Sequence, residues 1–558
     1  MVTKRSGINS SKFVIILILL SLTTIIGCDG DDWSFDLFGG DSVNGDDNNN
    51  NNNSNGNGDD DNSIGLFVVS VPEDSISDEF PAVIFSAITD DPKCNKPVAL
   101  FSSFDDGSKI EIAELTGVIS CNGTGDVFKV SPNGKLVAYL SEEKSQGDTE
   151  TRISELSSND VDVIEFDWSP DSSRIAYLVD DESDDRVALY TNLAEGGENR
   201  KVSGSLPLGG EVEAFEWSPD SSLLAYTADQ NNLNEFELFT TPPNKRDPVK
   251  VSGNVSPNRG DVTKFSWSPG GSRIAYLSDQ RLADFFQLFT SRPRRSEDPD
   301  RISEDVNVLQ FAWAPDEIDR SLAYSSGRNI YTARPNGDDN ERVTPDLTDG
   351  GKISDFSWAP NSTRIAYLAD RESDEVFELS TVEPDGNDDL RISGDLTDGG
   401  DVTDFSWAPN SARIAYLADQ DTDEVFELFS AEPDDNDDLR ISGDLTDDDD
   451  VTDFSWAPNS QRIAYLANQR AVGAVELFSA TPDGEENDKV SGDLVIGGNV
   501  GEFIWAPDSS GIGYIADKLT DEVFELFEST PDGAETATLS GSFAEDEDGD
   551  VLFFEWVP

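Results

Sequence analysis

Residues 402–442 read VTDFSWAPNSARIAYLADQDTDEVFELFSAEPDDNDDLRIS. The first six residues alternate, so Phe405 and Trp407 fall on one face, as in a half-buried strand. A tight turn follows, in which Pro409 fixes one corner and Asn410 tolerates the next. Polar segments then separate three more predicted strands, at 413–417, 425–429 and 439–442. The stretch therefore predicts a unit of four short antiparallel strands.

The motif Phe-x-Trp-(Ser/Ala)-Pro, or a close variant of it, recurs along the chain at intervals of 45 to 51 residues. A weaker copy has Val130 at the tryptophan position, and a second column of tyrosines lies at a fixed place in each unit. We interpret the tryptophans as core packing between units rather than as a sugar-stacking platform. They are Trp168, Trp217, Trp267, Trp313, Trp358, Trp407, Trp456, Trp505 and Trp556.

Four strands per repeat of this length predict an all-β fold, a β-propeller of four-stranded blades. A helical solenoid is the alternative for such a period, but Trp-Ser-Pro turns and repeated β-branched runs argue against helices.

Two segments, WSPDSSRIAYL (168–178) and WAPNSTRIAYLAD (358–370), resemble the TolB-type, WD40-like propeller repeat of exported bacterial proteins. Prolyl-oligopeptidase-type and tricorn-type propellers carry a similar repeat. The resemblance spans 130–558, with a weaker extension over 80–129, and it implies the fold rather than one function. We expect neither the α/β domain that precedes the propeller in TolB nor a hydrolase domain, so neither activity is carried over.

The last motif, around Trp556, has no second, third or fourth strand after it. Residues 82–86, 98–101 and 110–113 match those missing strands, which predicts a shared blade that closes the ring. With nine complete units, this gives one ring of about ten blades. Two smaller propellers are the alternative, and the extra strand at 66–70 is a feature that could disturb the closure.

Composition excludes several classes of function. The chain has 113 Asp+Glu against 39 Lys+Arg, a formal charge of −74 and no histidine. Nucleophile–histidine pairs and His-ligated zinc, copper or haem are therefore excluded. Binding to nucleic acid, or to an anionic membrane through a basic patch, is not expected of so acidic a chain.

Residues 1–27 predict an export signal, with Lys4, Arg5 and Lys12 before an apolar run at 13–27. The run ends in Ile-Ile-Gly-Cys28, which resembles a bacterial lipobox and implies lipidation of Cys28. An ordinary signal peptide or an uncleaved anchor is the alternative. The Asp/Asn/Gly-rich stretch 28–64 predicts a disordered tether, and 65–558 the propeller. We thus expect a lipid-anchored protein of the cell envelope, facing the periplasm or the cell exterior.

Cys94 and Cys121 are the other two cysteines, and in an oxidising compartment they predict a disulfide. Two free thiols are the alternative.

Acidic residues cluster in the predicted loops, and three interpretations compete. These are a solvated acidic surface, Ca²⁺ binding by oxygen ligands, and a rim that attracts a basic protein or peptide. The Ca²⁺ candidates are Asp398, Asp401, Asp447, Asp448, Asp449, Asp450, Asp546, Asp548 and Asp550.

Two further columns of charged residues recur from unit to unit, which indicates architecture rather than catalysis. The column on the third strand is Glu378, Glu427, Glu476 and Glu525, and that on the second is Arg174, Arg273, Arg364, Arg413 and Arg462.

The sequence thus favours a non-enzymatic module that binds or scaffolds an envelope protein or peptide, with Ca²⁺ as the one cofactor it suggests. A carboxylate-based glycan hydrolase or lyase is the alternative.

Overall fold

The computed structural model divides into two units, Met1–Asp61 and Asn62–Pro558. All the residues that it describes belong to the second unit. They are 64–72, 83–88, 98–103, 109–115, 128–141, 151–154, 161–181, 185–253, 261–316, 321–347, 350–371, 376–396, 399–422, 424–435, 438–445, 449–469, 473–541 and 550–558.

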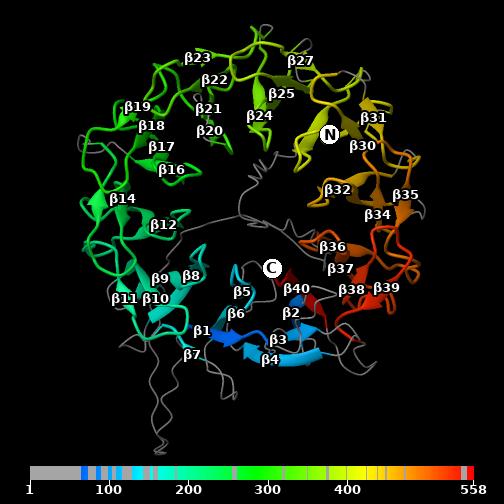
Figure 1. Ribbon diagram of the computed structural model, residues 1–558, viewed down its shortest axis with the longest axis horizontal. Helices are drawn as coiled ribbons and strands as arrows, with labels where there is room; N and C mark the ends of the chain where they lie inside the picture. Colours follow the sequence, from blue (N-terminus) through cyan, green and yellow to red (C-terminus); the bar gives the residue numbers. More distant parts are fainter. Residues whose placement is uncertain are drawn as a thin grey trace, which may run out of the picture. The chain divides into compact units, whose positions relative to one another are not determined.

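The second unit is a ring of ten four-stranded antiparallel sheets, the blades of a β-propeller (Figure 1). We number the blades from 1 to 10 in the order of their first strands, which lie on the inner side of the ring. The predicted all-β fold and the count of ten are confirmed.

Eight blades are each built from four strands consecutive in the chain, and their bounds are as follows. Blade 2 has β8 (Val161–Trp168), β9 (Arg174–Asp181), β10 (Arg186–Leu193) and β11 (Arg200–Lys201); blade 3 has β12 (Val212–Trp217), β13 (Leu224–Ala228), β14 (Glu237–Thr241) and β15 (Val249–Lys250). Blade 4 has β16 (Val262–Trp267), β17 (Ile274–Ser278), β18 (Gln287–Ser291) and β19 (Asp300–Arg301); blade 5 has β20 (Gln310–Trp313), β21 (Leu322–Ser325), β22 (Ile330–Ala333) and β23 (Glu341–Arg342). Blade 6 has β24 (Ile353–Trp358), β25 (Ile365–Ala369), β26 (Glu378–Val382) and β27 (Leu390–Arg391); blade 7 has β28 (Val402–Trp407), β29 (Ile414–Ala418), β30 (Glu427–Ala431) and β31 (Asp438–Arg440). Blade 8 has β32 (Val451–Trp456), β33 (Ile463–Ala467), β34 (Glu476–Ala480) and β35 (Asn487–Lys489); blade 9 has β36 (Val500–Trp505), β37 (Ile512–Ala516), β38 (Glu525–Ser529) and β39 (Thr536–Thr538).

The predicted shared blade is confirmed. In blade 10, β40 (Val551–Trp556) from the C-terminal end pairs with β2 (Val83–Ile88), which continues into β3 (Val98–Ser103) and β4 (Lys109–Leu115). The register places Phe554 opposite Phe85. Pairing of the two ends of the ring removes the free edges that open sheets leave.

The prediction of nine complete units was wrong for one of them. Blade 1 contains β5 (Phe128–Val130), β6 (Leu136–Ser141) and β7 (Thr151–Arg152), but its third strand is β1 (Gly65–Ser70), which lies between β6 and β7. Phe67 of β1 stacks on Tyr139 with ring centroids 5.7 Å apart. The same aromatic pair joins the second and third strands of other blades, such as Tyr226 and Phe239 at 5.5 Å. The strand at 66–70 therefore completes a blade and does not disturb the closure.

The core consists of layers between blades. Each second-strand tyrosine from Tyr139 to Tyr514 is fully buried. Trp407 packs on Ala366 and Leu368 of blade 6 within one cluster, and the other blades repeat this contact with their own tryptophans.

The turn after each tryptophan differs in detail from the prediction. The left-handed residue is Ser411 (φ 62°), not Asn410, and serine holds the same conformation in five other blades. Its side chain explains the choice over glycine, because Ser411 Oγ accepts the Asn361 N–H of the preceding blade at 3.0 Å. A strained backbone angle is thus offset by a hydrogen bond between blades.

Candidate functional site

Several of the predicted site residues lie outside the described residues. These are Cys28, Cys94 and Cys121, and the Ca²⁺ candidates Asp398, Asp447, Asp448, Asp546 and Asp548. The described part of the chain contains no helix with the length and apolar character that crossing a bilayer requires.

Three of the four described Ca²⁺ candidates accept a backbone hydrogen bond from the blade before them. The carboxylates of Asp401 and Asp450 accept the N–H groups of Phe377 (2.7 Å) and Phe426 (2.9 Å). Asp550 accepts the N–H of Phe524 at 2.9 Å in the same way. Each acceptor precedes a first strand and each donor precedes a third strand, so one carboxylate connects two blades.

A second residue extends this connection within the blade. Asp419, at the end of the second strand, accepts the N–H of Asp401, and Asp279 accepts that of Asp261 at 3.0 Å. We call the two residues together the blade clasp, which in blade 7 is Asp401 with Asp419.

Asparagine takes either place in the blade clasp. Asn468 accepts the Asp450 N–H at 2.7 Å in blade 8, and Asn499 accepts the Val475 N–H at 2.9 Å in blade 9. An amide carries no charge, so the clasp requires an acceptor oxygen rather than an anion. The fourth described candidate, Asp449, is buried next to the clasp residue Asp450. Within the described ranges, no group of three or more Asp, Glu or Cys side chains is placed to hold a metal ion.

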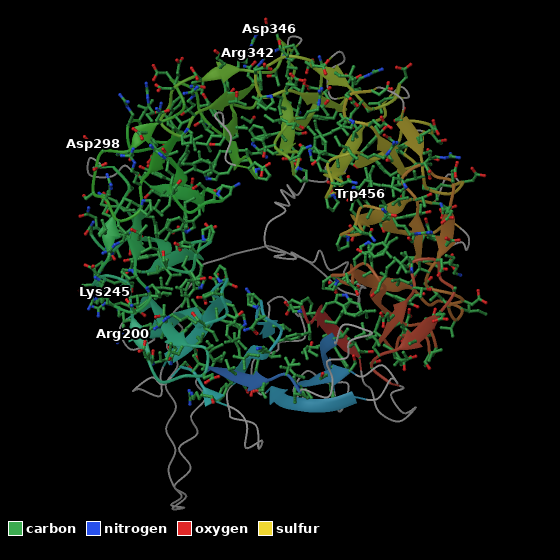
Figure 2. The ribbon with its side chains drawn as sticks, in the orientation of Figure 1. Arg200, Lys245, Asp298, Arg342, Asp346 and Trp456 are labelled. Carbon is green, nitrogen blue, oxygen red and sulfur yellow. The ribbon has the colours of Figure 1, made fainter. Side chains whose placement is uncertain are left out.

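The tryptophan column also connects neighbouring blades. The indole Nε1–H of Trp456 donates to the Ser406 carbonyl at 3.1 Å, and that of Trp505 to the Ser455 carbonyl at 3.1 Å. Trp556 closes the series by donating to Ile504 at 3.1 Å. All nine side chains are at least nine-tenths buried, and Figure 2 shows Trp456 on the inner side of its blade. These rings are therefore not available for stacking on a sugar.

Most members of the recurring charged columns form ion pairs within their own blade. Buried Glu378 and Glu427 bind Arg391 (2.7 Å) and Arg440 (2.6 Å) of the fourth strand. Arg364 on the second strand binds Asp388 of the turn between the third and fourth strands at 2.9 Å. The structure thus places both columns within the frame, as their recurrence predicts.

The inner strands hold a set of carboxyls that the sequence reasoning missed. Burial raises the pKa of Glu216 and of Glu502 to about 7, and that of Asp355 to about 6, with nearby Asp167, Asp453 and Asp404 adding repulsion. Glu502 Oε1 is buried and has no hydrogen-bond partner within the described residues. The available signal was an acidic residue one or three places before the tryptophan of the first strand.

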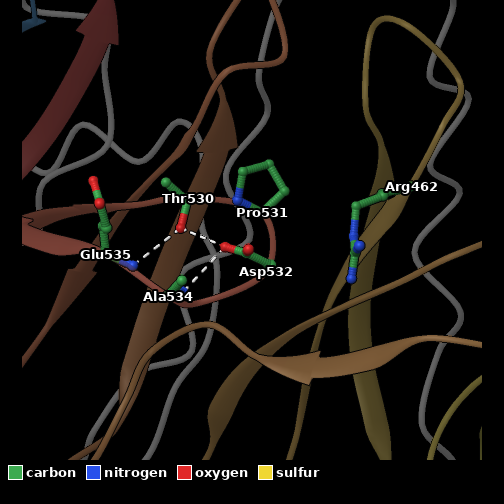
Figure 3. Close-up of a pocket in the computed structure, with 6 residues that line it drawn as sticks. All are labelled: Arg462, Thr530, Pro531, Asp532, Ala534 and Glu535. Atoms are coloured by element: carbon green, nitrogen blue, oxygen red, sulfur yellow. Dashed lines mark hydrogen bonds between the residues drawn. The ribbon is translucent and has the colours of Figure 1, made fainter.

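An open depression lies on the rim beside Arg462, lined by Thr530, Pro531, Asp532, Ala534 and Glu535 (Figure 3). Asp532 accepts hydrogen bonds from Thr530 Oγ1 (2.6 Å) and the Ala534 N–H (3.1 Å), which hold its pKa below the usual range. Thr481 and Asp483 form the same turn at 2.6 Å one blade earlier. The depression is therefore part of the repeat and shows no feature of its own.

No protein-family model matches the chain. The search of curated proteins likewise found no match. Among solved structures, dipeptidyl peptidase 4 of Porphyromonas gingivalis is similar with 12% identity and a TM-score of 0.44, over 81% of this chain and 59% of that one. The chain thus spans less than two thirds of that peptidase. An oligogalacturonate lyase in complex with manganese has 11% identity and a TM-score of 0.34, over 56% of this chain and 87% of that one. A protein from Agrobacterium tumefaciens assigned as TolB has 15% identity and a TM-score of 0.27, over 46% of this chain and 93% of that one. These proteins differ in function, and at such identities the likeness concerns the fold alone.

Proposed function

We propose that this chain is a lipid-anchored β-propeller of the cell envelope that binds or scaffolds an envelope protein or peptide without catalysis. The observation that supports it most is the blade clasp, together with the ion-paired columns. Most of the recurring charged side chains near the core are thereby engaged in holding blades together. What remains for a ligand is the exposed part of the two rims.

A basic partner suits most of that exposed surface. Asp395 and Asp444 are 94% and 97% exposed, and among the described residues each pairs with an arginine four residues before it. Such exposed pairs contribute little stability, so these carboxylates are available for a cationic segment. Ca²⁺ would act here by bridging exposed carboxylates of the ring and of the partner.

The anchor part of the proposal rests on residues 13–28, whose sequence resembles a lipobox. We expect Cys28→Ser to move the protein from the membrane fraction to the soluble fraction. Continued membrane association of the variant would contradict lipidation at this residue.

The binding part can be tested by cross-linking and capture from envelope extract, with and without a Ca²⁺ chelator. The matched variant carries Asp395→Asn and Asp444→Asn, which removes two carboxylate charges and leaves both arginines in place. We expect the tagged wild-type ring to capture a specific partner that untagged ring displaces. The variant should bind this partner less tightly. Capture of no displaceable partner under either condition would contradict the proposal.

A carboxylate-based glycan hydrolase or lyase is the second candidate, and one observation favours it. A carboxyl with a pKa of about 7, as at Glu502 and Glu216, can donate a proton at neutral pH. If the ring cleaves an envelope glycan, Glu502→Gln or Glu216→Gln should abolish turnover without loss of folding. Turnover that survives both substitutions would exclude these carboxyls as the acid.

A further inference from the structure

Charge is distributed unevenly around the ring. Residues 201–300, which contain blade 3 and all of blade 4 except Arg301, have 11 Lys+Arg and 14 Asp+Glu. Residues 351–450, which contain blades 6 and 7, have 6 Lys+Arg and 29 Asp+Glu. The two segments have equal length and the same blade architecture but differ strongly in charge.

Five of the eleven cations in residues 201–300 lie in the turns between the third and fourth strands. These turns contain Lys245, Arg246, Arg292, Arg294 and Arg295, which we call the arginine platform. Figure 2 shows Lys245 at the outer edge of the ring.

Cations outnumber the carboxylates that contact them in the arginine platform. Lys245 and Arg294 share Asp247, at 2.8 and 2.7 Å. Arg292 and Arg295 share Glu297, at the looser distances of 3.6 and 3.4 Å. Arg246 binds neutral oxygens, the Ser203 carbonyl and the Ser205 hydroxyl. Asp298 is also exposed in the same turn, so five cations stand against three carboxylates and the surface keeps a net positive charge with unused donors.

The arginine platform is also held in a fixed shape. Arg294 donates to both the carbonyl and the carboxylate of Asp247 at 2.7 Å, which connects the turn of blade 4 to that of blade 3. Lys245 and Arg294 together lower the pKa of Asp247 to about 2. In contrast, the side chains of Lys245, Arg292 and Arg295 are 56%, 53% and 58% exposed. The link between the two turns is therefore formed before any partner arrives, while these three exposed side chains are accessible to a partner.

The corresponding turns of blades 6 and 7 are acidic. In blade 7, Glu432, Asp434 and Asp435 are exposed, with Arg413 as the neighbouring cation at 3.2 Å from Glu432. In blade 6, Asp385 and Asp388 are exposed, and Arg364 binds Asp388. Because the strands run in the same order in every blade, these turns and the arginine platform lie on the same rim.

We propose that two copies of this chain associate face to face, with the arginine platform of each on the acidic turns of blades 6 and 7 of the other. A two-fold axis through the region of blade 5 exchanges the two sectors, so both contacts form at once and the assembly is closed. This inference does not depend on the lipid anchor or on the partner proposed above.

The overall charge opposes this association, and the balance depends on salt. At about 0.01 M ionic strength the screening length is about 30 Å, so the net negative charge of each ring repels the other. At about 0.15 M it falls to about 8 Å, and only the facing turns interact. Much higher salt screens those contacts as well. The dimer should therefore be most populated at intermediate salt.

The test is sedimentation velocity of the purified full chain over a range of concentration and salt, with charge-swap variants. Variant P carries Lys245→Glu, Arg292→Glu and Arg295→Glu, and variant A carries Glu432→Lys, Asp434→Lys and Asp435→Lys. The control for variant P has the same charge change at exposed sites elsewhere, Lys135→Glu, Arg342→Glu and Lys352→Glu. All these side chains are exposed or half-exposed, so folding should persist, and circular dichroism checks it.

We expect the wild-type chain and the control to dimerise, and variants P and A each to dissociate at least about 100-fold more readily, since several charge contacts become repulsive by symmetry. An equimolar mixture of P and A should regain the dimer, because both contacts are then complementary. A monomeric wild-type chain at every salt concentration would overturn the proposal. A dimer that persists in variant P would also overturn it, and so would a mixture of P and A that stays monomeric. In either case the arginine platform would not bind the acidic turns of a second copy, and an acidic partner other than this chain would be its candidate ligand.

Discussion

Blades 3 and 4 have the same kind of core packing as blades 6 and 7, but the turns of the two pairs differ in charge. In both pairs a tryptophan of the inner strand packs on the preceding blade, and an aspartate clasp joins neighbouring backbones. The turns of blades 3 and 4 expose arginine and lysine, while those of blades 6 and 7 expose aspartate and glutamate. The frame therefore uses side chains as hydrogen-bond acceptors and packing groups, which leaves the sign of the surface charge free to vary.

The tryptophan contacts should be equally important in both regions. Trp217→Ala in blade 3 and Trp358→Ala in blade 6 should each lower the free energy of unfolding by about 3–5 kcal/mol, because each leaves a cavity between blades. Urea denaturation followed by fluorescence or circular dichroism measures this, with the fully exposed Ile496→Ala as control. Losses that differ by several kcal/mol would show that the tryptophans of the two regions are not packed in the same way.

Stability should depend on pH differently in the two regions. The folded-state pKa is about 7 for Glu216 in blade 3 and about 6 for Asp355 in blade 6, in each case above the usual range because of burial. A raised pKa means that folding favours the protonated form. The stabilising contribution is therefore present below the usual pKa and is lost as pH rises, towards about 7 for Glu216 and about 6 for Asp355.

Neutral substitutions test that sign. Glu216→Gln and Asp355→Asn should each raise the free energy of unfolding at pH 8 by on the order of 1 kcal/mol, after allowance for partial exposure, and so raise the melting temperature; both should change little at pH 4. Thermal melts at the two values measure this. A variant that is less stable than wild type at pH 8 would contradict the account of that carboxyl.

Salt should affect the two regions to different extents. Raising ionic strength from about 0.01 to 0.5 M screens repulsion, which is greater where acids outnumber bases more strongly. Hydrogen exchange should therefore slow more in blades 6 and 7 than in blades 3 and 4, by a few tenths of a kcal/mol in opening free energy. An equal change in exchange rate in both regions on raising the salt concentration would indicate that the difference in surface charge does not affect local opening.

The repeat made most of the fold predictable. Trp407, Tyr416 and their counterparts recur at fixed spacing because every blade must fill the same layer, and the strands that match a missing second, third and fourth strand identified the shared blade. The place of β1 was not predictable from the repeat, because Phe67 completes blade 1 from more than 60 residues before β6.

The candidate site was predictable only in part. Acidic loops suggested Ca²⁺ ligands, but the sequence could not show that Asp401 and Asp450 face backbone N–H groups of the preceding blade. Asn499 at the position of Asp401 and Asp450, and Asn468 at the position of Asp419, were the available signal that charge is not required in the clasp. The arginine platform depends on two turns 47 residues apart, joined by Arg294 and Asp247, and such proximity follows from the ring rather than from local sequence.

The central claim is that the recurring rim aspartates act as hydrogen-bond acceptors between blades, and urea denaturation of two variants at Asp401 tests it most directly. Asp401→Asn keeps an acceptor for the Phe377 N–H, as Asn499 does for Val475, and should lie within about 0.5 kcal/mol of wild type with or without a Ca²⁺ chelator. Asp401→Ala leaves that N–H without its acceptor and should cost about 1–3 kcal/mol. An asparagine variant as unstable as the alanine variant, or a wild-type chain that the chelator destabilises to the same extent, would contradict the claim.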